Sequence, residues 1–286
     1  MKNIIEKHDR EVNRFLEILP GLFSWTVLSI PIWLSFIAPT LVAYFVIFFI
    51  VYWFYRSAEL AINSIRSYVI LSAHTRLNWN EELKKIDTSE LKPEEIHHVV
   101  VIPTYKEPIG VLEKSIECIK RQTFGTKQIS VIIGFEERDE KGKEIAKELK
   151  KKYKGVFENF WINVHPLIPG EVAGKSSNMA HVAKNVKRYV DERGWDLGKV
   201  TISSSDSDSR LPEQYFSYLT HKYISDPDRE LHFYQGALLF YNNIWRVPLP
   251  VRVVNTIGSI WNLSKLMRPA KLINVSTYTM SLKLCY

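Results

Sequence analysis

Hydrophobic and polar residues follow two different patterns in this chain, one before and one after residue 57. From Gly21 to Tyr55 there is no Lys, Arg, Asp, Glu or His. As a single helix this stretch would be about 50 Å long, whereas the hydrocarbon core of a bilayer is about 30 Å thick. Pro39 disfavours helix at the residue before it. The pattern therefore predicts a transmembrane hairpin at 21–56, built from two short helices at about 20–37 and 39–56.

Basic residues flank this uncharged stretch on both sides. They are Lys2, Lys7, Arg10 and Arg14 before it, and Arg56, Arg66 and Arg76 after it. A hairpin puts both flanks on one side of the membrane, and an excess of Lys and Arg marks that side as cytoplasmic. A cleaved signal peptide would be shorter and would begin closer to the N-terminus. We therefore expect a multi-pass membrane protein with a cytoplasmic N-terminal segment, 1–20, and a cytoplasmic domain after the hairpin.

The segment 57–95 links the hairpin to the rest of the chain. Residues 57–79 place apolar side chains at helical spacing, among them Leu60, Ile65 and Val69. Such a helix would either lie along the membrane interface or pack on the domain that follows, and both alternatives stay open at this point. Residues 80–95 are charged and polar, so we expect a connector there.

From residue 96 to residue 286 short apolar runs alternate with amphipathic segments. The apolar runs lie at 98–102, 129–133, 160–164 and 199–204, and the helical periods lie at 111–122, 140–152 and 177–189. Strands that alternate with helices predict an α/β domain with a mainly parallel sheet. Ligands of such folds bind at the carboxyl ends of the strands. The residues after the first and the last of these runs are therefore candidates for a functional site.

Two carboxylates one residue apart, Asp206 and Asp208, follow the last strand-like run directly. Mg²⁺ and Mn²⁺ prefer hard oxygen ligands, and Mg²⁺ is usually held by one or two carboxylates together with substrate phosphates. Two further polar segments accompany the pair, 103–107 after the first strand-like run and 174–178 before the third helix. Together the three segments indicate a site for a metal-bound nucleotide diphosphate.

Composition narrows the choice of partners. The net charge of +7 suits a surface that faces anionic lipid headgroups and a phosphate-bearing substrate. The chain has no basic motif interleaved with aromatic residues and no zinc-ligand pattern, so nucleic acid is not expected as a partner. Cys118 and Cys285 are the only cysteines, which argues against a disulfide framework.

The three segments, in this order and spacing, resemble the family 2 glycosyltransferases with a GT-A fold. They read Val99-Val100-Val101-Ile102-Pro103-Thr104-Tyr105-Lys106-Glu107, Gly174-Lys175-Ser176-Ser177-Asn178 and Ser205-Asp206-Ser207-Asp208. The likeness is greatest to the membrane-attached, cellulose synthase-like members of polysaccharide biosynthesis, and it covers roughly 96–240. It implies a GT-A-like domain that transfers a sugar, with inversion, from a nucleotide-diphosphate donor to a glycan or lipid acceptor. The donor would be a UDP-sugar.

The resemblance also implies roles for single residues. Pro103, Thr104 and Tyr105 would line the pocket of the base, and Glu107 would bind the ribose. The family has an Asp near the base after the second strand, where this chain has Glu136 and Glu137.

The other two segments would bind the diphosphate. Lys175 would neutralise a phosphate, and Asn178 would hydrogen-bond the donor. Asp206 and Asp208 would hold Mn²⁺ or Mg²⁺, with Asp206 also near the nucleotide and Asp208 the more direct ligand.

The general base of an inverting transferase is not identified in the sequence. Inverting members of the family use a further Asp for this step, and this chain has no Asp or Glu after Glu230. We therefore expect a C-terminally truncated chain with little or no transfer activity, which leaves open a non-catalytic donor-binding or structural membrane subunit. A further alternative is a haloacid dehalogenase-like phosphatase, in which Asp206 would be the nucleophile. That family carries its motif near the start of the domain, and about a hundred residues of α/β pattern precede Asp206.

Overall fold

The computed structural model describes residues 9–86, 90–268 and 277–286. The described residues fall into two compact units, which meet in the chain at Ile62 and Asn63. The predicted α/β class, the mainly parallel sheet and the two apolar N-terminal helices are all confirmed.

The first unit consists of helix α2 (Asp9–Leu34) and the first part of helix α3 (Pro39–Arg76). The predicted break falls between them, with Pro39 as the first residue of α3. Both helices are long and apolar enough to cross a membrane, judged by length and composition. The hydroxyls of Ser24 and Thr26 donate to backbone carbonyls one turn earlier in α2. Such internal partners are what an apolar environment requires of polar groups in a helix.

Helix α3 does not end at the boundary expected near residue 56. It continues to Arg76, so the helix predicted at 57–79 is mostly the C-terminal part of α3. The chain has neither Gly nor Pro between residues 40 and 92, and a change from apolar to charged side chains does not by itself interrupt a helix. A short helix, α4 (Trp79–Lys84), lies within the segment expected to be a connector.

The part of α3 that belongs to the second unit packs on helix α9 (Leu249–Leu266). The Ser67 hydroxyl donates to the Leu263 carbonyl at 2.6 Å, and the Ser64 hydroxyl donates to the Ile260 carbonyl at 3.1 Å. Ser67 is buried. Of the two alternatives for this segment, these contacts favour packing on the domain.

The second unit is built on a six-stranded sheet in the order β3-β2-β1-β4-β6-β5. Strands β1 to β4 run parallel, whereas β6 runs antiparallel to both β4 and β5. Every residue of β2 is buried, as expected for an apolar run that is covered on both faces of a parallel sheet. The bounds of the strands are β1 His97–Thr104, β2 Ile129–Glu136, β3 Asn159–His165, β4 Val200–Ser204, β5 Phe233–Tyr234 and β6 Tyr278–Ser281.

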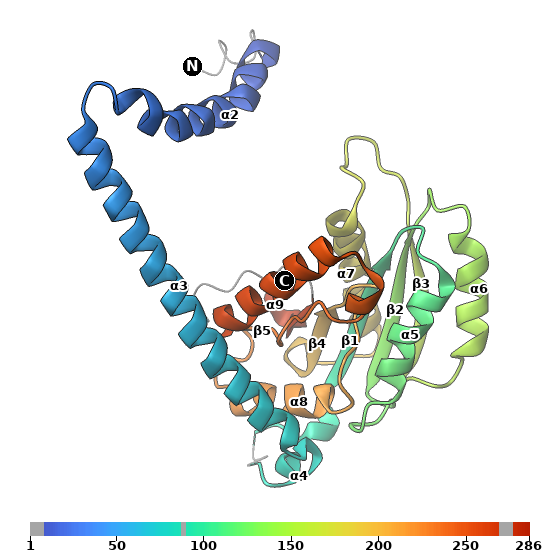
Figure 1. Ribbon diagram of the computed structural model, residues 1–286. Coiled ribbons are helices and arrows are strands. Elements are labelled where there is room, and N and C mark those ends of the chain that lie inside the picture. The colour runs from blue at the N-terminus through green and yellow to red at the C-terminus, as the bar shows by residue number, and fades with distance from the viewer. Residues whose placement is uncertain (1–8, 87–89, 269–276) are drawn as a thin grey trace. The chain divides into compact units, whose positions relative to one another are not determined.

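Alternate residues of the central strand β1 point to opposite faces of the sheet. Val100 and Ile102 pack in one core with α5 (Ile109–Lys120), α6 (Gly142–Lys152) and α8 (Tyr215–Ser225). Val99 and Val101 pack in the other core with α7 (Lys175–Glu192). Helices therefore cover both faces of the parallel strands (Figure 1). The remaining elements are the 3₁₀ turns η1 Pro93–Glu95, η2 Leu197–Lys199, η3 Ile244–Arg246 and η5 Leu282–Cys285.

The order of the strands creates a crevice next to β1. The chain runs from β1 outward to β2 and β3, then returns to the opposite side of β1 to form β4. Connections that leave two neighbouring strands in opposite directions open a crevice at their carboxyl ends. The segments that begin at Pro103 and at Ser205 both start at this crevice.

Candidate functional site

A cavity of about 510 Å³ opens at the carboxyl ends of the parallel strands. It is lined by residues from β1 and the segment after it, β2, α5, the first turn of α7, the segment after β4 and the segment 242–246. Every residue that the sequence analysis assigned to nucleotide or metal binding lies on its wall, namely Pro103, Thr104, Tyr105, Glu107, Glu136, Lys175, Asn178, Asp206 and Asp208. Glu137, the alternative to Glu136, is not among the lining residues and accepts a hydrogen bond from the Leu167 backbone N–H at 3.0 Å.

The turn that carries the two aspartates is held through its backbone. The Ser115 hydroxyl on α5 donates to the Ser207 carbonyl at 2.6 Å, and the Asn242 side-chain amide donates to the Asp208 carbonyl at 2.9 Å. The hydroxyls of Ser209 and Thr277 are 2.9 Å apart. Since these contacts use backbone atoms and neighbouring hydroxyls, the carboxylates of the turn stay on the wall of the cavity.

The donor set of this turn suits a hard divalent cation. The Asp208 side chain is exposed, and the Asp206 carboxylate is bonded by the Lys175 ammonium. Within residues 9–86, 90–268 and 277–286, no group of three or more His, Cys, Asp and Glu side chains is arranged to hold a metal ion. Two carboxylates nevertheless fit the way in which Mg²⁺ is usually held, because substrate phosphates and water supply the other oxygens.

The first turn of α7 brings a positive helix end to the cavity. Lys175 is the first residue of this 18-residue helix, and the free N–H groups and the dipole of a helix N-terminus favour anions. Asn178 lies one turn later and is buried, with its amide donating to the Gly134 carbonyl of β2 at 2.7 Å. This hydrogen bond therefore holds the first turn of α7 against β2.

Two polar atoms at the cavity are buried without a hydrogen-bond partner in the described part of the chain. They are Asn178 Oδ1 and Thr104 Oγ1. A buried polar atom without a partner costs roughly 1–3 kcal/mol, so a ligand that hydrogen-bonds either atom would regain part of that cost.

Tyr105 forms an aromatic platform at the edge of the cavity. The side chain is 37% exposed, and the Arg138 guanidinium carbon lies 4.1 Å from the centre of its ring. Arg138 Nε is 2.5 Å from Glu136 Oε2, and this carboxylate raises the pKa of Arg138. Glu136 is thus already paired with a cation, which the sequence did not reveal. Tyrosine and guanidinium are both planar and both able to stack on a nucleobase.

Asp139 shapes the turn that follows β1, although it does not line the cavity. Its carboxylate is buried and accepts from the backbone N–H groups of Lys106 at 2.8 Å and Gly142 at 3.2 Å. Among the described residues Lys106 is the only non-glycine with positive φ, at 58°. Asp139 therefore stabilises a left-handed residue placed between Tyr105 and Glu107, and we regard it as a positioning residue.

Sequence reasoning missed part of the wall. Three of the missed residues are basic, and none of them forms an ion pair with another described residue. The full set is Val111, Lys114, Ser207, Arg210, Asn242, Asn243 and Arg246. Lys114 carries a local signal, because it lies on the face of α5 opposite the buried Leu112, Ile116 and Ile119. Asn242, Asn243 and Arg246 carry none, since they reach the cavity from a distant part of the chain.

No protein-family model matches this chain, and no curated protein matches it. Among solved structures, the chain is similar to the mannosyltransferase PcManGT from Pyrobaculum calidifontis, which was determined in complex with GDP-Man and Mn²⁺. The two chains are 12% identical, with a TM-score of 0.39. The similarity covers 79% of this chain and 54% of the other, so this chain spans about half the length of that protein.

Proposed function

We propose that this protein is a membrane-anchored glycosyltransferase of the family 2 type, which binds a UDP-sugar together with Mn²⁺ or Mg²⁺. In this proposal 21–56 anchors the chain in the bilayer and 96–286 is a cytoplasmic GT-A-like domain. The sugar is transferred with inversion to a glycan or lipid acceptor. One observation carries the proposal: residues from four separate segments, chosen from the sequence alone, converge on a single cavity at the switch point of the sheet.

The dimensions and chemistry of the cavity support a nucleotide ligand. A volume of about 510 Å³ lies within the usual range of small-molecule sites, about 300–1,000 Å³. We assign the base to the Tyr105 platform beside Arg138, and the ribose to Glu107, whose carboxylate accepts hydrogen bonds from hydroxyl groups. The unpartnered oxygens of Thr104 and Asn178 are suited to accept hydrogen bonds from the same ligand.

We assign the diphosphate to the opposite wall. Asp206 and Asp208 would hold the divalent cation jointly with the phosphate oxygens. A bound cation supplies positive charge that stabilises the departing diphosphate. The Lys175 ammonium bonds the Asp206 carboxylate. When the donor binds, this ammonium would pair with a phosphate oxygen instead. The N-terminus of α7 adds its own attraction for anions.

Calorimetry of the full-length protein in detergent, with UDP in the presence and absence of Mn²⁺, tests this proposal. We expect UDP to bind more tightly with Mn²⁺, and Asp208→Asn to reduce the Mn²⁺-dependent affinity at least about tenfold, since disturbing the surroundings of a metal alone costs about 10- to 100-fold. Asp191→Asn is the matched control, because Asp191 forms only a surface ion pair with Lys187. Equal UDP affinity with and without Mn²⁺ would contradict the metal assignment.

Activity assays on the same protein distinguish a transferase from a non-catalytic subunit. Sugar transfer from radiolabelled UDP-sugars, or slow release of sugar to water, is expected of the enzyme. Mn²⁺-dependent UDP binding with neither reaction would favour the donor-binding subunit.

A further inference from the structure

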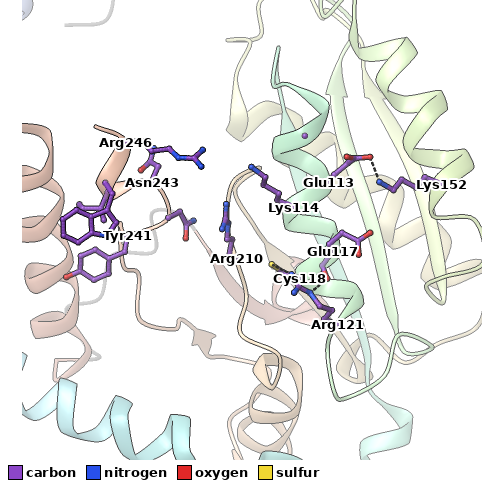
Figure 2. Close-up of a pocket in the computed structure, with 14 residues that line it drawn as sticks. Glu113, Lys114, Glu117, Cys118, Arg121, Lys152, Arg210, Tyr241, Asn243 and Arg246 are labelled. Atoms are coloured by element: carbon purple, nitrogen blue, oxygen red, sulfur yellow. Dashed lines mark hydrogen bonds and ion pairs between the residues drawn. The ribbon is translucent and has the colours of Figure 1, made fainter. Parts of the chain in front are cut away.

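A second cavity, of about 690 Å³, adjoins the first. It lies between α5 and the segment 241–246, both within the second unit (Figure 2). Five residues line both cavities: Lys114, Arg210, Asn242, Asn243 and Arg246. A ligand in the second cavity would therefore lie next to one in the first.

The charge of the second cavity is one-sided. Its wall has two acidic side chains, Glu113 and Glu117, against five basic ones, which are Lys114, Arg121, Lys152, Arg210 and Arg246. Glu113 pairs with Lys152 of the same wall at 2.6 Å, and Glu117 accepts from the Tyr153 hydroxyl at 2.9 Å, so neither acid pairs with Lys114, Arg210 or Arg246. In the first cavity, by contrast, four acidic and four basic side chains balance one another.

The excess positive charge is concentrated where the two cavities meet. Lys114 on α5, Arg210 after β4 and Arg246 at the end of η3 lie toward one another in the space between α5 and the segment 241–246 (Figure 2). No other described residue forms an ion pair with any of the three. Like charges that share a space repel one another, and a phosphate group would offset this repulsion while accepting hydrogen bonds from both guanidinium groups.

Two aromatic side chains line the part of the second cavity that is not shared with the first. Trp245 is 81% exposed and Tyr241 is 46% exposed, and both line the second cavity without lining the first. Large aromatic side chains left exposed beside a cavity are typical of a surface that binds the organic part of a ligand. The cavity thus combines a cluster of three cations with exposed aromatic side chains.

We propose that the second cavity binds the acceptor, and that this acceptor carries a phosphate monoester. Lys114, Arg210 and Arg246 hold the phosphate beside the donor sugar, while Tyr241 and Trp245 contact the organic part. This inference rests on the proposed function, and it specifies the acceptor class of the same site.

Transfer of the sugar to such a phosphate requires no general base. A phosphate oxygen forms a bond to the anomeric carbon, and the bond from that carbon to the UDP oxygen breaks, with its electron pair leaving on UDP. The second pKa of a phosphate monoester is about 6, so the attacking oxygen is already deprotonated at neutral pH. The products are UDP and a sugar phosphodiester.

Binding measurements on the detergent-solubilised full-length protein test the inference. A prenyl phosphate lipid and a soluble sugar phosphate offer the same phosphate chemistry, so the probes are geranyl phosphate and glucose 1-phosphate, with geraniol and glucose as neutral partners. Where a phosphorylated probe binds, we expect its affinity to be at least about tenfold higher than that of its neutral partner. The reason is that a hydrogen bond to a charged group contributes about 1.5–3 kcal/mol. The tighter of the two phosphates identifies the source as lipid or soluble.

Variants separate this site from the donor site. Arg246→Gln and Trp245→Ala are expected to weaken geranyl phosphate binding several-fold, whereas Arg188→Gln, an exposed change on α7, should not. If Arg246→Gln lowers the affinity for UDP with Mn²⁺ and leaves both phosphate probes unaffected, the cations serve the donor and the inference is overturned. Equal binding of neutral and phosphorylated probes overturns it as well. If a phosphate probe binds in a way that depends on Arg246, and UDP does not bind at all, the proposed function is contradicted while the anion site stands.

Discussion

His98 shows how strongly a single buried side chain depends on its surroundings. It lies in β1 and is completely buried, with Nδ1 at 2.7 Å from the Thr201 hydroxyl and Nε2 at 2.8 Å from the Thr220 hydroxyl. Burial lowers the pKa of His98 to about 3, with a smaller contribution from His97. The His98 imidazole therefore stays neutral in the folded protein between about pH 6.5 and pH 3, where an unfolded histidine binds a proton.

We expect His98 to make the protein less stable as the pH falls. Between about pH 6.5 and pH 3 the unfolded chain binds a proton that the folded His98 does not, so the free energy of unfolding decreases by about 1.4 kcal/mol per pH unit. From pH 7.5 to pH 5 the loss is about 2 kcal/mol by the same relation. Chemical denaturation at several pH values measures it, and His98→Gln should flatten the slope.

His232 is the control for this experiment, because its pKa shifts the other way. It is exposed and bonded to Asp226, which raises the pKa of His232. Its contribution to stability is complete below the unfolded pKa and is lost as the pH rises through the folded one. His232→Gln should therefore remove a small stabilisation present at low pH. An unchanged pH slope in His98→Gln would show that His98 is not the titrating group.

Between elements, the contact of β2 with α7 depends on the absence of one side chain. A Cβ atom at Gly134 would lie 2.9 Å from Asn178 Oδ1 and 3.1 Å from Val182 Cγ2. Because both partners are buried on α7, neither has free space into which to move. Glycine at this position lets the first turns of α7 approach the carboxyl end of β2, where Lys175 reaches the cavity.

We expect Gly134→Ala to displace the start of α7. Overpacking of a tight contact costs typically about 1–3 kcal/mol, and the shift should also weaken UDP binding because it moves Lys175. Thermal unfolding and calorimetry measure the two effects. Gly110→Ala is the control for stability, since a Cβ at Gly110 meets nothing within 4 Å. A Gly134→Ala protein as stable as the parent would mean that the close contact relaxes without cost.

At the scale of the molecule, the chain combines two helices that are long and apolar enough to cross a membrane with an α/β domain. We expect the start of α2 and the α/β domain to lie on the same, cytoplasmic side of the membrane, because two spans return the chain to the side from which it started and both flanks are basic. The turn between α2 and α3, in which Phe36 is exposed, should lie on the other side.

Cysteine labelling in sealed vesicles measures this topology. Single cysteines at Arg10 and Lys143, in a protein with Cys118→Ser and Cys285→Ser, should react with a membrane-impermeant reagent from the same side. Phe36→Cys should react only from the opposite side. Reaction of Arg10→Cys and Lys143→Cys from opposite sides would rule out the hairpin.

The sequence by itself determined the features that depend on local pattern. Apolar runs and helical periods placed β1 to β4 and α5 to α7 to within a few residues, because the periods of 2 and 3.6 are properties of each segment alone. The uncharged stretch and Pro39 predicted two apolar helices and the break between them, but not their outer ends, because α2 begins at Asp9 and α3 ends at Arg76. The rule that ligands bind at the carboxyl ends of parallel strands pointed to the residues after the first and the last strand-like run, and the resemblance to family 2 glycosyltransferases added Glu136, Lys175 and Asn178.

Tertiary structure alone decided what those residues contact. The pairing of Glu136 with Arg138, the left-handed Lys106 held by Asp139 and the burial of Asn178 follow from packing, which no local period encodes. Strand β6 and the second cavity join segments that lie far apart in the chain. Only folding brings such segments together, because their contacts depend on the relative placement of whole elements.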